Sequence, residues 1–111
     1  MTTLKLVGRV SRDQISDDVT ELDLDGATRI EMMACKGLYH LEKVYLNDNC
    51  RDIEAGAFED CPNMQQINIP EALDHIPIRF LADCTFLNAI YIPEKVEDIG
   101  FCAFYRCFCL N

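Results

Sequence analysis

The stretch I53-E-A-G-A-F-E-D-C61 returns later in the chain as I99-G-F-C-A-F-Y-R-C107. Both copies keep the isoleucine, an Ala-Phe pair and the final cysteine at the same positions. Cys84 lies midway between the two final cysteines, so that cysteines recur at an interval of 23 residues. A constant interval of this length is typical of a repeat protein made of stacked units.

Each repeat also contains the pattern L-x-x-L-x-L. Matches begin at Val19, Leu41, Met64 and Leu87, and a less regular match begins at Met1. The alternation that closes the pattern is typical of a strand with one buried face. One strand per repeat, with a return path of fixed length, predicts a solenoid with a parallel strand sheet on one face. The A-F-x-x-C piece predicts a short helix or 3-10 turn on the opposite, outer face.

The unit I90-Y-I-P-E-K-V-E-D-I-G-F-C-A-F-Y-R-C107 resembles the BspA-like class of leucine-rich repeats. The resemblance runs from Val19 onward and implies a leucine-rich-repeat solenoid of the α/β class, dominated by β-structure. We therefore predict a single domain over 1–111, with 1–18 as a divergent N-terminal unit or cap and 19–111 as repeats. The resemblance also implies a binding protein, often on bacterial or protozoan surfaces and with adhesion as the usual role. Leu38 departs from the pattern at a cysteine position, and Pro77 stands where Gly100 is found.

Composition limits the kinds of partner. The chain has 10 basic and 19 acidic residues and a net charge of −9. This charge disfavours nucleic acid and acidic membrane surfaces, and favours a protein partner with a basic surface. No apolar run reaches the length of a membrane-spanning helix, and residues 1–14 do not resemble a signal peptide. Together with the many cysteines this favours a cytoplasmic location, while the resemblance keeps the cell surface as an alternative.

Most of the seven cysteines fall at positions that are apolar in the other repeats. Cys61, Cys84 and Cys107 share one register and predict a buried column, while Cys35 and Cys50 take the registers of buried apolar residues. Free cysteine packs as a small hydrophobe. Disulfides between neighbours in the column are an alternative, because strands lie about 4.8 Å apart and disulfide Cα separations begin at about 4.4 Å. A reducing compartment is the simpler interpretation.

The C-terminal cysteines Cys102, Cys107 and Cys109 form C-x₄-C-x-C. They lack the second pair of ligands that zinc fingers and ribbons use, so no metal or cofactor is predicted. A small thiol-redox or metal-binding protein is nevertheless the alternative function.

Catalysis has little support in the sequence. His40 and His75 fall in different registers, and neither stands beside a candidate nucleophile. The acidic pairs Asp17-Asp18, Glu59-Asp60 and Glu97-Asp98 fit a solvated surface. We therefore predict that the chain is not an enzyme.

The outward positions of the strand pattern predict a binding face. The final x of the pattern is Asp23, Tyr45, Asn68 and Tyr91 in successive repeats, and Lys43 and Gln66 flank these positions. Tyrosine is enriched at interaction hot spots, although it also simply suits a strand. We predict a protein-binding surface centred on Tyr45, Asn68 and Tyr91.

The last repeat is unusually apolar at its variable positions. Phe101, Tyr105, Phe108 and Cys109 replace residues that are small or polar in the repeat at 41–63. An exposed apolar end is a liability in a monomer. It predicts self-association as an isologous homodimer, the alternative being that the chain was cut from a longer array.

Overall fold

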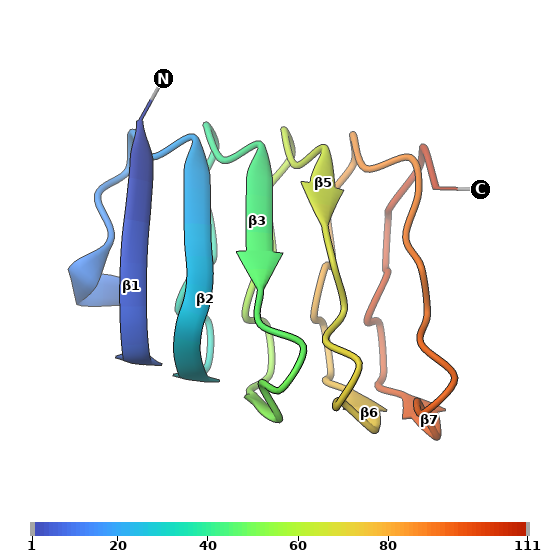
Figure 1. Ribbon diagram of the computed structural model, residues 1–111. Coiled ribbons are helices and arrows are strands. Elements are labelled where there is room, and N and C mark those ends of the chain that lie inside the picture. Colours follow the sequence, from blue (N-terminus) through green and yellow to red (C-terminus); the bar gives the residue numbers. More distant parts are fainter. Residues whose placement is uncertain (1, 111) are drawn as a thin grey trace.

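The computed structural model describes residues 2–110 of the chain. The repeats 19–40, 41–63, 64–86 and 87–110 each make one turn of a solenoid, and residues 2–18 precede them (Figure 1). The two ends of the chain lie at opposite ends of the stack.

A parallel sheet forms one face of the stack. Its strands, in spatial order, are β1 (Thr3–Val10), β2 (Glu21–Ile30), β3 (Lys43–Leu46) and β5 (Gln66–Ile67). Leu22 pairs with Val44 and Leu24 with Leu46, so the apolar positions of the strand pattern stand in columns. The less regular N-terminal match also supplies a strand, since Leu4 pairs with Leu22. Met1, where that match begins, lies outside the described residues.

Shorter strands form a second set of pairs where the chain leaves the sheet. β4 (Asp52–Ile53) pairs with the end of β2, and β6 (His75–Ile76) pairs with β7 (Asp98–Ile99). The predicted leucine-rich-repeat solenoid, dominated by β-structure, is therefore confirmed.

The return path contains turns instead of the expected short helices. We call the segments 31–37, 54–60, 77–83 and 100–106 the outer turns. Within residues 2–110 the one helical element is η1, a 3-10 helix at Arg12–Gln14, which lies before the repeats. Each outer turn has two residues with left-handed φ, first at Met33, Gly56, Arg79 and Cys102, and then at Gly37, Asp60, Asp83 and Arg106. Left-handed residues interrupt a right-handed helix, so the prediction of helical pieces was wrong.

Hydrogen bonds join the outer turns to one another. The N–H groups of Gly56, Phe58 and Asp60 donate to carbonyl groups of the following repeat, at N–O distances of 2.9, 3.1 and 2.7 Å. The same alternate positions donate in the repeats before and after. The outer face is therefore held together by main-chain bonds, as the sheet is.

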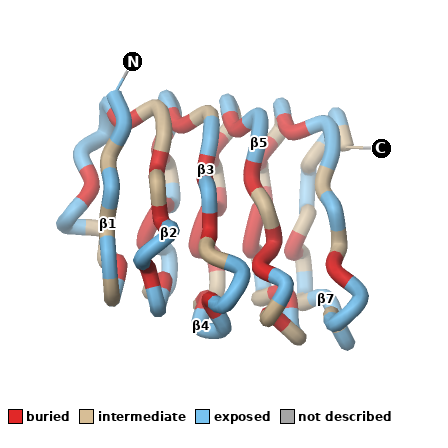
Figure 2. Tube along the Cα trace, in the orientation of Figure 1, coloured by how far each residue is buried: buried red, intermediate tan, exposed pale blue. Residues whose placement is uncertain are grey.

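Buried residues lie along both the sheet and the outer turns (Figure 2). Their apolar side chains form one core cluster. Val44 and Leu46 are buried on either side of the exposed Tyr45, as the alternation predicts. The rings of Phe58 and Phe80 meet edge to face at 5.8 Å. Sheet and outer turns therefore share one continuous core.

The last repeat departs from this order. The strand predicted within 87–92 is not assigned, although the equivalent residues of three earlier repeats form strands. No strand follows it in the described chain, so it lacks the second neighbour that interior strands have. Ile99 is 53% exposed, whereas Ile76 one repeat earlier is 1% exposed.

Gly100 allows the last repeat to approach the one before it. A Cβ atom at this position would lie 2.5 Å from Ile78 N and 2.7 Å from Pro77 C. Gly56 has a different role, because its φ of +66° is left-handed and Gly100 has no such φ. The two glycines therefore meet different backbone requirements.

Candidate functional site

A groove runs across the exposed face of the sheet, and we call it the strand-face groove. Its volume is about 1200 Å³. All six residues predicted for the binding face line it, namely Asp23, Lys43, Tyr45, Gln66, Asn68 and Tyr91. The repeat register therefore gathers, on one surface, residues that span most of the chain.

Two tyrosines provide the large exposed side chains of this groove. Tyr45 is 52% exposed and Tyr91 is 65% exposed. Asn68 lies on the repeat between them. Such rings offer apolar area and a hydroxyl group to an incoming chain.

Asn68 is more firmly held than the sequence suggested. Its Oδ1 accepts a hydrogen bond from Leu46 N, and its Nδ2 donates to Leu46 O, both at 2.8 Å. The side-chain amide thus takes the place of a strand neighbour for Leu46. This half-buried residue fixes the floor of the strand-face groove between the tyrosines.

Charge is distributed unevenly along the groove. Glu21, Asp23 and Asp25 lie at the β2 end, with Lys43 beside them. The part formed by the repeats at 64–86 and 87–110 contributes amides, an alanine, isoleucines and Tyr91, and no charged side chain. One end is therefore acidic and the other is neutral and partly aromatic.

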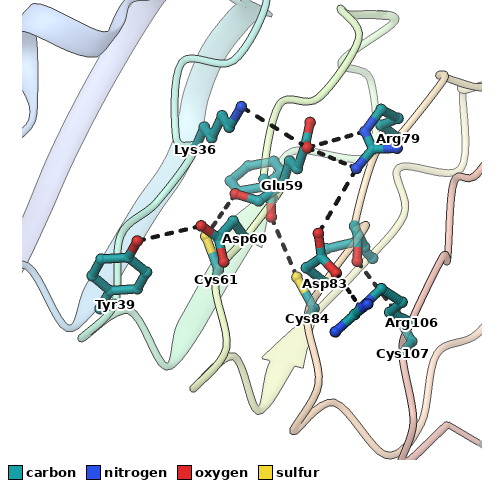
Figure 3. Close-up of polar contacts among 12 residues, drawn as sticks. Lys36, Tyr39, Glu59, Asp60, Cys61, Arg79, Asp83, Cys84, Arg106 and Cys107 are labelled. Carbon is teal, nitrogen blue, oxygen red and sulfur yellow. Dashed lines mark hydrogen bonds and ion pairs between the residues drawn. The ribbon is translucent and has the colours of Figure 1, made fainter.

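The outer turns contain an ionic network that crosses three repeat boundaries (Figure 3). Arg79 Nε donates a hydrogen bond to Glu59 Oε2 at 3.0 Å, and Arg79 Nη2 lies 3.0 Å from the same oxygen. Lys36 Nζ lies 3.9 Å from this oxygen as well. Arg79 also lies 3.8 Å from Asp83, whose other oxygen is 3.0 Å from Arg106. Opposite charges thus alternate along the network, to which the repeat at 64–86 contributes both Arg79 and Asp83.

Sequence reasoning missed this network. Glu59 was expected on the solvated surface but is 6% exposed, which is a correction to that prediction. Its position is equivalent to Lys36, Ala82 and Tyr105, so the repeat pattern gives no apolar signal there. Burial of the carboxylate depends on the basic side chains from neighbouring repeats.

The buried cysteine column is confirmed for Cys61 and Cys84, which are both 0% exposed, while Cys107 is half-buried. Each of the three thiols also donates to a carbonyl oxygen 26 residues earlier, at 3.1 to 3.3 Å. For Cys84 the acceptor is Phe58 O. The recurring cysteine therefore supplies a hydrogen-bond donor between repeats in addition to packing.

Burial strongly affects the acidity of these thiols. Desolvation raises the pKa of both Cys35 and Cys61 to about 12. It also raises the pKa of Cys50, Cys84 and Cys107. Because the thiolate is the reactive form, these five groups are poorly suited to redox chemistry at neutral pH.

All seven cysteines are free thiols. In the C-terminal group, Cys109 is exposed and Cys102 is half-buried. The Cys107 thiol donates a hydrogen bond to Leu81 O. Among residues 2–110 no group of three or more His, Cys, Asp or Glu side chains is arranged to hold a metal ion.

The residues predicted for self-association lie on the last repeat and are exposed. Phe101 is 77% exposed, Phe108 71% and Tyr105 49%, and Cys109 is also exposed. Arg79 lies over the Tyr105 ring and Arg106 over the Phe108 ring.

The stacked strands, shared core and 23-residue register define a leucine-rich-repeat β-solenoid. The family model for the BspA type leucine rich repeat region (6 copies) matches residues 16–111, and the chain belongs to this family. A search among curated proteins gave no significant match.

One solved structure shares the fold. It is the crystal structure of a leucine rich cell surface protein from Faecalibacterium prausnitzii, with a TM-score of 0.76 and 24% sequence identity. The match covers 87% of this chain and 32% of the other, so the chain spans about a third of that protein. In the described part of this chain, no helix has the length and apolar character needed to cross a bilayer.

Proposed function

We propose that this chain is a non-catalytic interaction module that binds a protein partner in the strand-face groove. The observation that supports this most directly is the groove itself, with its two exposed tyrosines and the fixed Asn68 between them. Repeat solenoids commonly bind partners along the surface that their strands present.

The distribution of charge favours one kind of occupant. A partner segment with a lysine or arginine near Asp23 and an apolar side chain near Tyr91 would match both ends of the groove. The net charge of −9 would increase the rate at which a basic partner arrives. Binding should therefore weaken as salt is added.

A quantitative pull-down from source lysate tests the proposal. The Tyr45→Ala/Tyr91→Ala double variant should lose most of a partner that the unchanged chain captures, while its circular dichroism stays the same. Tyr39→Ala is the matched control, since Tyr39 is 56% exposed and is not part of the groove. Equal capture by the unchanged chain and the double variant would contradict a groove-based function.

Two compartments suit such a module. The solved structure similar to this chain is described as a cell surface protein, which favours an adhesin-like role. The thiol bonds of Cys61, Cys84 and Cys107 favour a reducing compartment, because a disulfide in the column would remove two donors. We propose the cytoplasm on this ground. Thiol counting in freshly isolated, denatured protein tests it, since fewer than seven thiols would favour the surface.

The thiol-redox alternative rests on Cys102 and Cys109, the two cysteines of the C-terminal group whose thiols are not bonded to a carbonyl. It predicts that one of these thiols reacts with disulfide reagents far faster than ordinary exposed cysteine does. A rate like that of an unfolded peptide would leave the interaction module as the function.

A further inference from the structure

The strand-face groove presents its two tyrosines at a regular interval. Asp23 pairs in register with Tyr45 on the neighbouring strand, and Asn68 and Tyr91 line the groove on the next two repeats. Neighbouring strands of a sheet lie about 4.8 Å apart, so the two tyrosines are about 9.6 Å apart along the stack. A segment lying across β2, β3 and β5, which stand side by side in Figure 1, therefore meets a tyrosine, an amide and a second tyrosine in turn.

This interval distinguishes between the regular conformations of a bound segment. A polyproline II helix has three residues per turn and rises about 9.3 Å in each turn. An extended strand returns to the same face about every 6.7 Å, and two turns of an α-helix rise about 10.8 Å. The polyproline II conformation comes closest to the interval, and presents equivalent residues to Tyr45 and Tyr91.

The polar groups of the groove also suit this conformation. A polyproline II segment has no internal hydrogen bonds, and proline has no N–H group, so its main chain offers carbonyl acceptors alone. The groove provides donors in the side-chain amides of Gln66 and Asn88 and in the hydroxyl groups of Tyr45 and Tyr91. Both tyrosines are more than half exposed. Aromatic-lined grooves are the surfaces on which proline-rich segments dock.

One carboxylate at the acidic end of the groove is available to a cation. Glu21 stands beside Lys43 in the strand register. Asp23 Oδ1 accepts a hydrogen bond from Asp25 N at 3.1 Å, and the Asp23 carboxylate has no ion pair within residues 2–110. It lies one strand beyond Tyr45. An arginine of the partner would form charge-assisted hydrogen bonds there.

We propose, building on the proposed function, that the partner segment is proline-rich, adopts the polyproline II conformation and carries an arginine at one end. Successive turns of the segment pack against Tyr45 and Tyr91. Its carbonyl groups accept hydrogen bonds from the amide and hydroxyl groups of the groove. The arginine binds Asp23 and sets the direction in which the segment lies.

Fluorescence anisotropy with labelled synthetic peptides is the first test. The probe is a peptide in which one arginine precedes a polyproline run of about three turns. The comparison peptide has the same arginine and length but replaces the prolines with a flexible glycine-serine sequence. The proline peptide should bind about tenfold more tightly, because its conformation is already formed. Equal affinities, or no binding of the proline peptide, would overturn the proposal.

The contribution of the tyrosines is measured with single variants. Tyr45→Ala and Tyr91→Ala should each weaken binding of the proline peptide by about tenfold. Tyr39→Ala is the matched control and should leave its affinity unchanged, since Tyr39 is exposed but does not line the groove. The same affinity in all three variants would place the peptide elsewhere on the chain and contradict the proposal.

The position of the arginine is tested by a matched pair of charge changes. Asp23→Asn should weaken binding of the arginine peptide and have no effect on a polyproline peptide without arginine. Glu71→Gln removes the same charge from an exposed position outside the groove. It should leave both affinities unchanged. Equal losses in Asp23→Asn and Glu71→Gln would show that net charge alone attracts the arginine, contrary to the proposal.

Alanine substitution along the peptide examines its conformation directly. The largest losses of affinity should recur at every third residue, because one face of a polyproline II helix repeats with that period. Losses at every second residue would indicate an extended strand and overturn the proposal.

These outcomes are separate from those of the lysate experiment. If the Tyr45→Ala/Tyr91→Ala double variant loses a lysate partner while the proline peptide fails to bind, the groove is a binding site for a segment of another conformation, and only the polyproline inference fails. If the double variant also keeps the lysate partner, the proposed function fails as well.

Discussion

The thiol of Cys84 donates a hydrogen bond to the carbonyl oxygen of Phe58 on the preceding repeat, with Sγ and O 3.3 Å apart. Cys61 and Cys107 make the equivalent bonds to Cys35 O and Leu81 O. The cysteine column therefore joins successive repeats at a point where the main chain provides no donor.

Replacing Cys84 with alanine should show the energetic value of this bond. Cys35 is the matched control, because it is equally buried and its thiol makes no such bond. We expect Cys84→Ala to lower the free energy of unfolding by about 1 kcal/mol more than Cys35→Ala. Denaturant unfolding measures the difference. Equal losses would mean that the Cys84 thiol contributes through packing alone.

The Glu59–Arg79 pair should stabilise the outer turns. Arg79→Ala leaves the buried Glu59 carboxylate with only the more distant Lys36, and we expect the melting temperature to fall by several degrees. Arg51→Ala is the control, since Arg51 is exposed and makes no ion pair in the described chain. A melting temperature that fell equally in both variants would show that the pair adds no stability.

The His75–Asp98 pair should make stability depend on pH. The two side chains lie 2.5 Å apart, and this hydrogen bond, followed by the charges of Asp98 and Asp74, raises the pKa of His75. The stabilisation is fully present below the unfolded pKa of about 6.5 and is lost as pH rises through the higher folded pKa.

Thermal melts of the unchanged chain and of His75→Gln at a series of pH values measure this effect. The difference in melting temperature should be largest below pH 6.5 and should disappear at alkaline pH. His40→Gln should follow the unchanged chain throughout, because His40 has no carboxylate partner among residues 2–110. A His75→Gln difference that did not vary with pH would rule out the charged pair.

Gly100→Ala should loosen the last repeat. The new Cβ would meet main-chain atoms of Pro77 and Ile78, and overpacking against atoms that cannot easily move costs about 1–3 kcal/mol. At Gly26 the equivalent clash is with the exposed Val7 side chain, so Gly26→Ala should cost less. Hydrogen exchange at Leu81 and Asp83, which donate to the last repeat, should rise only in Gly100→Ala. Unchanged exchange would mean that the repeat shifts without loss of these bonds.

We propose that residues 1–18 act as an N-terminal cap. β1 covers one edge of β2, and the buried Val10 and Ile15 extend the core. A chain consisting of 19–111 should therefore melt at a lower temperature and bind more of an apolar dye than the full chain. An unchanged melting temperature would show that the repeats need no such cover.

The sequence by itself determined the period, the strand alternation and the buried columns. These follow from the side chain each position carries, because one face of every strand must leave water and the same position recurs in each repeat. The six predicted residues that line the strand-face groove could be found for the same reason, since each is the outward neighbour of a buried or half-buried position.

Tertiary structure decided which polar groups meet across repeats. Three contacts each join residues about one repeat apart in the chain. They are the hydrogen bond of Arg79 to the buried Glu59, the amide bonds of Asn68 to Leu46, and the thiol bond of Cys84 to Phe58. The left-handed outer turns, which replace the expected helices, set how these groups are directed. Local patterns specify which face a side chain occupies. Hydrogen-bond geometry between repeats depends on distances of a few tenths of an ångström, which are fixed only when the repeats have stacked.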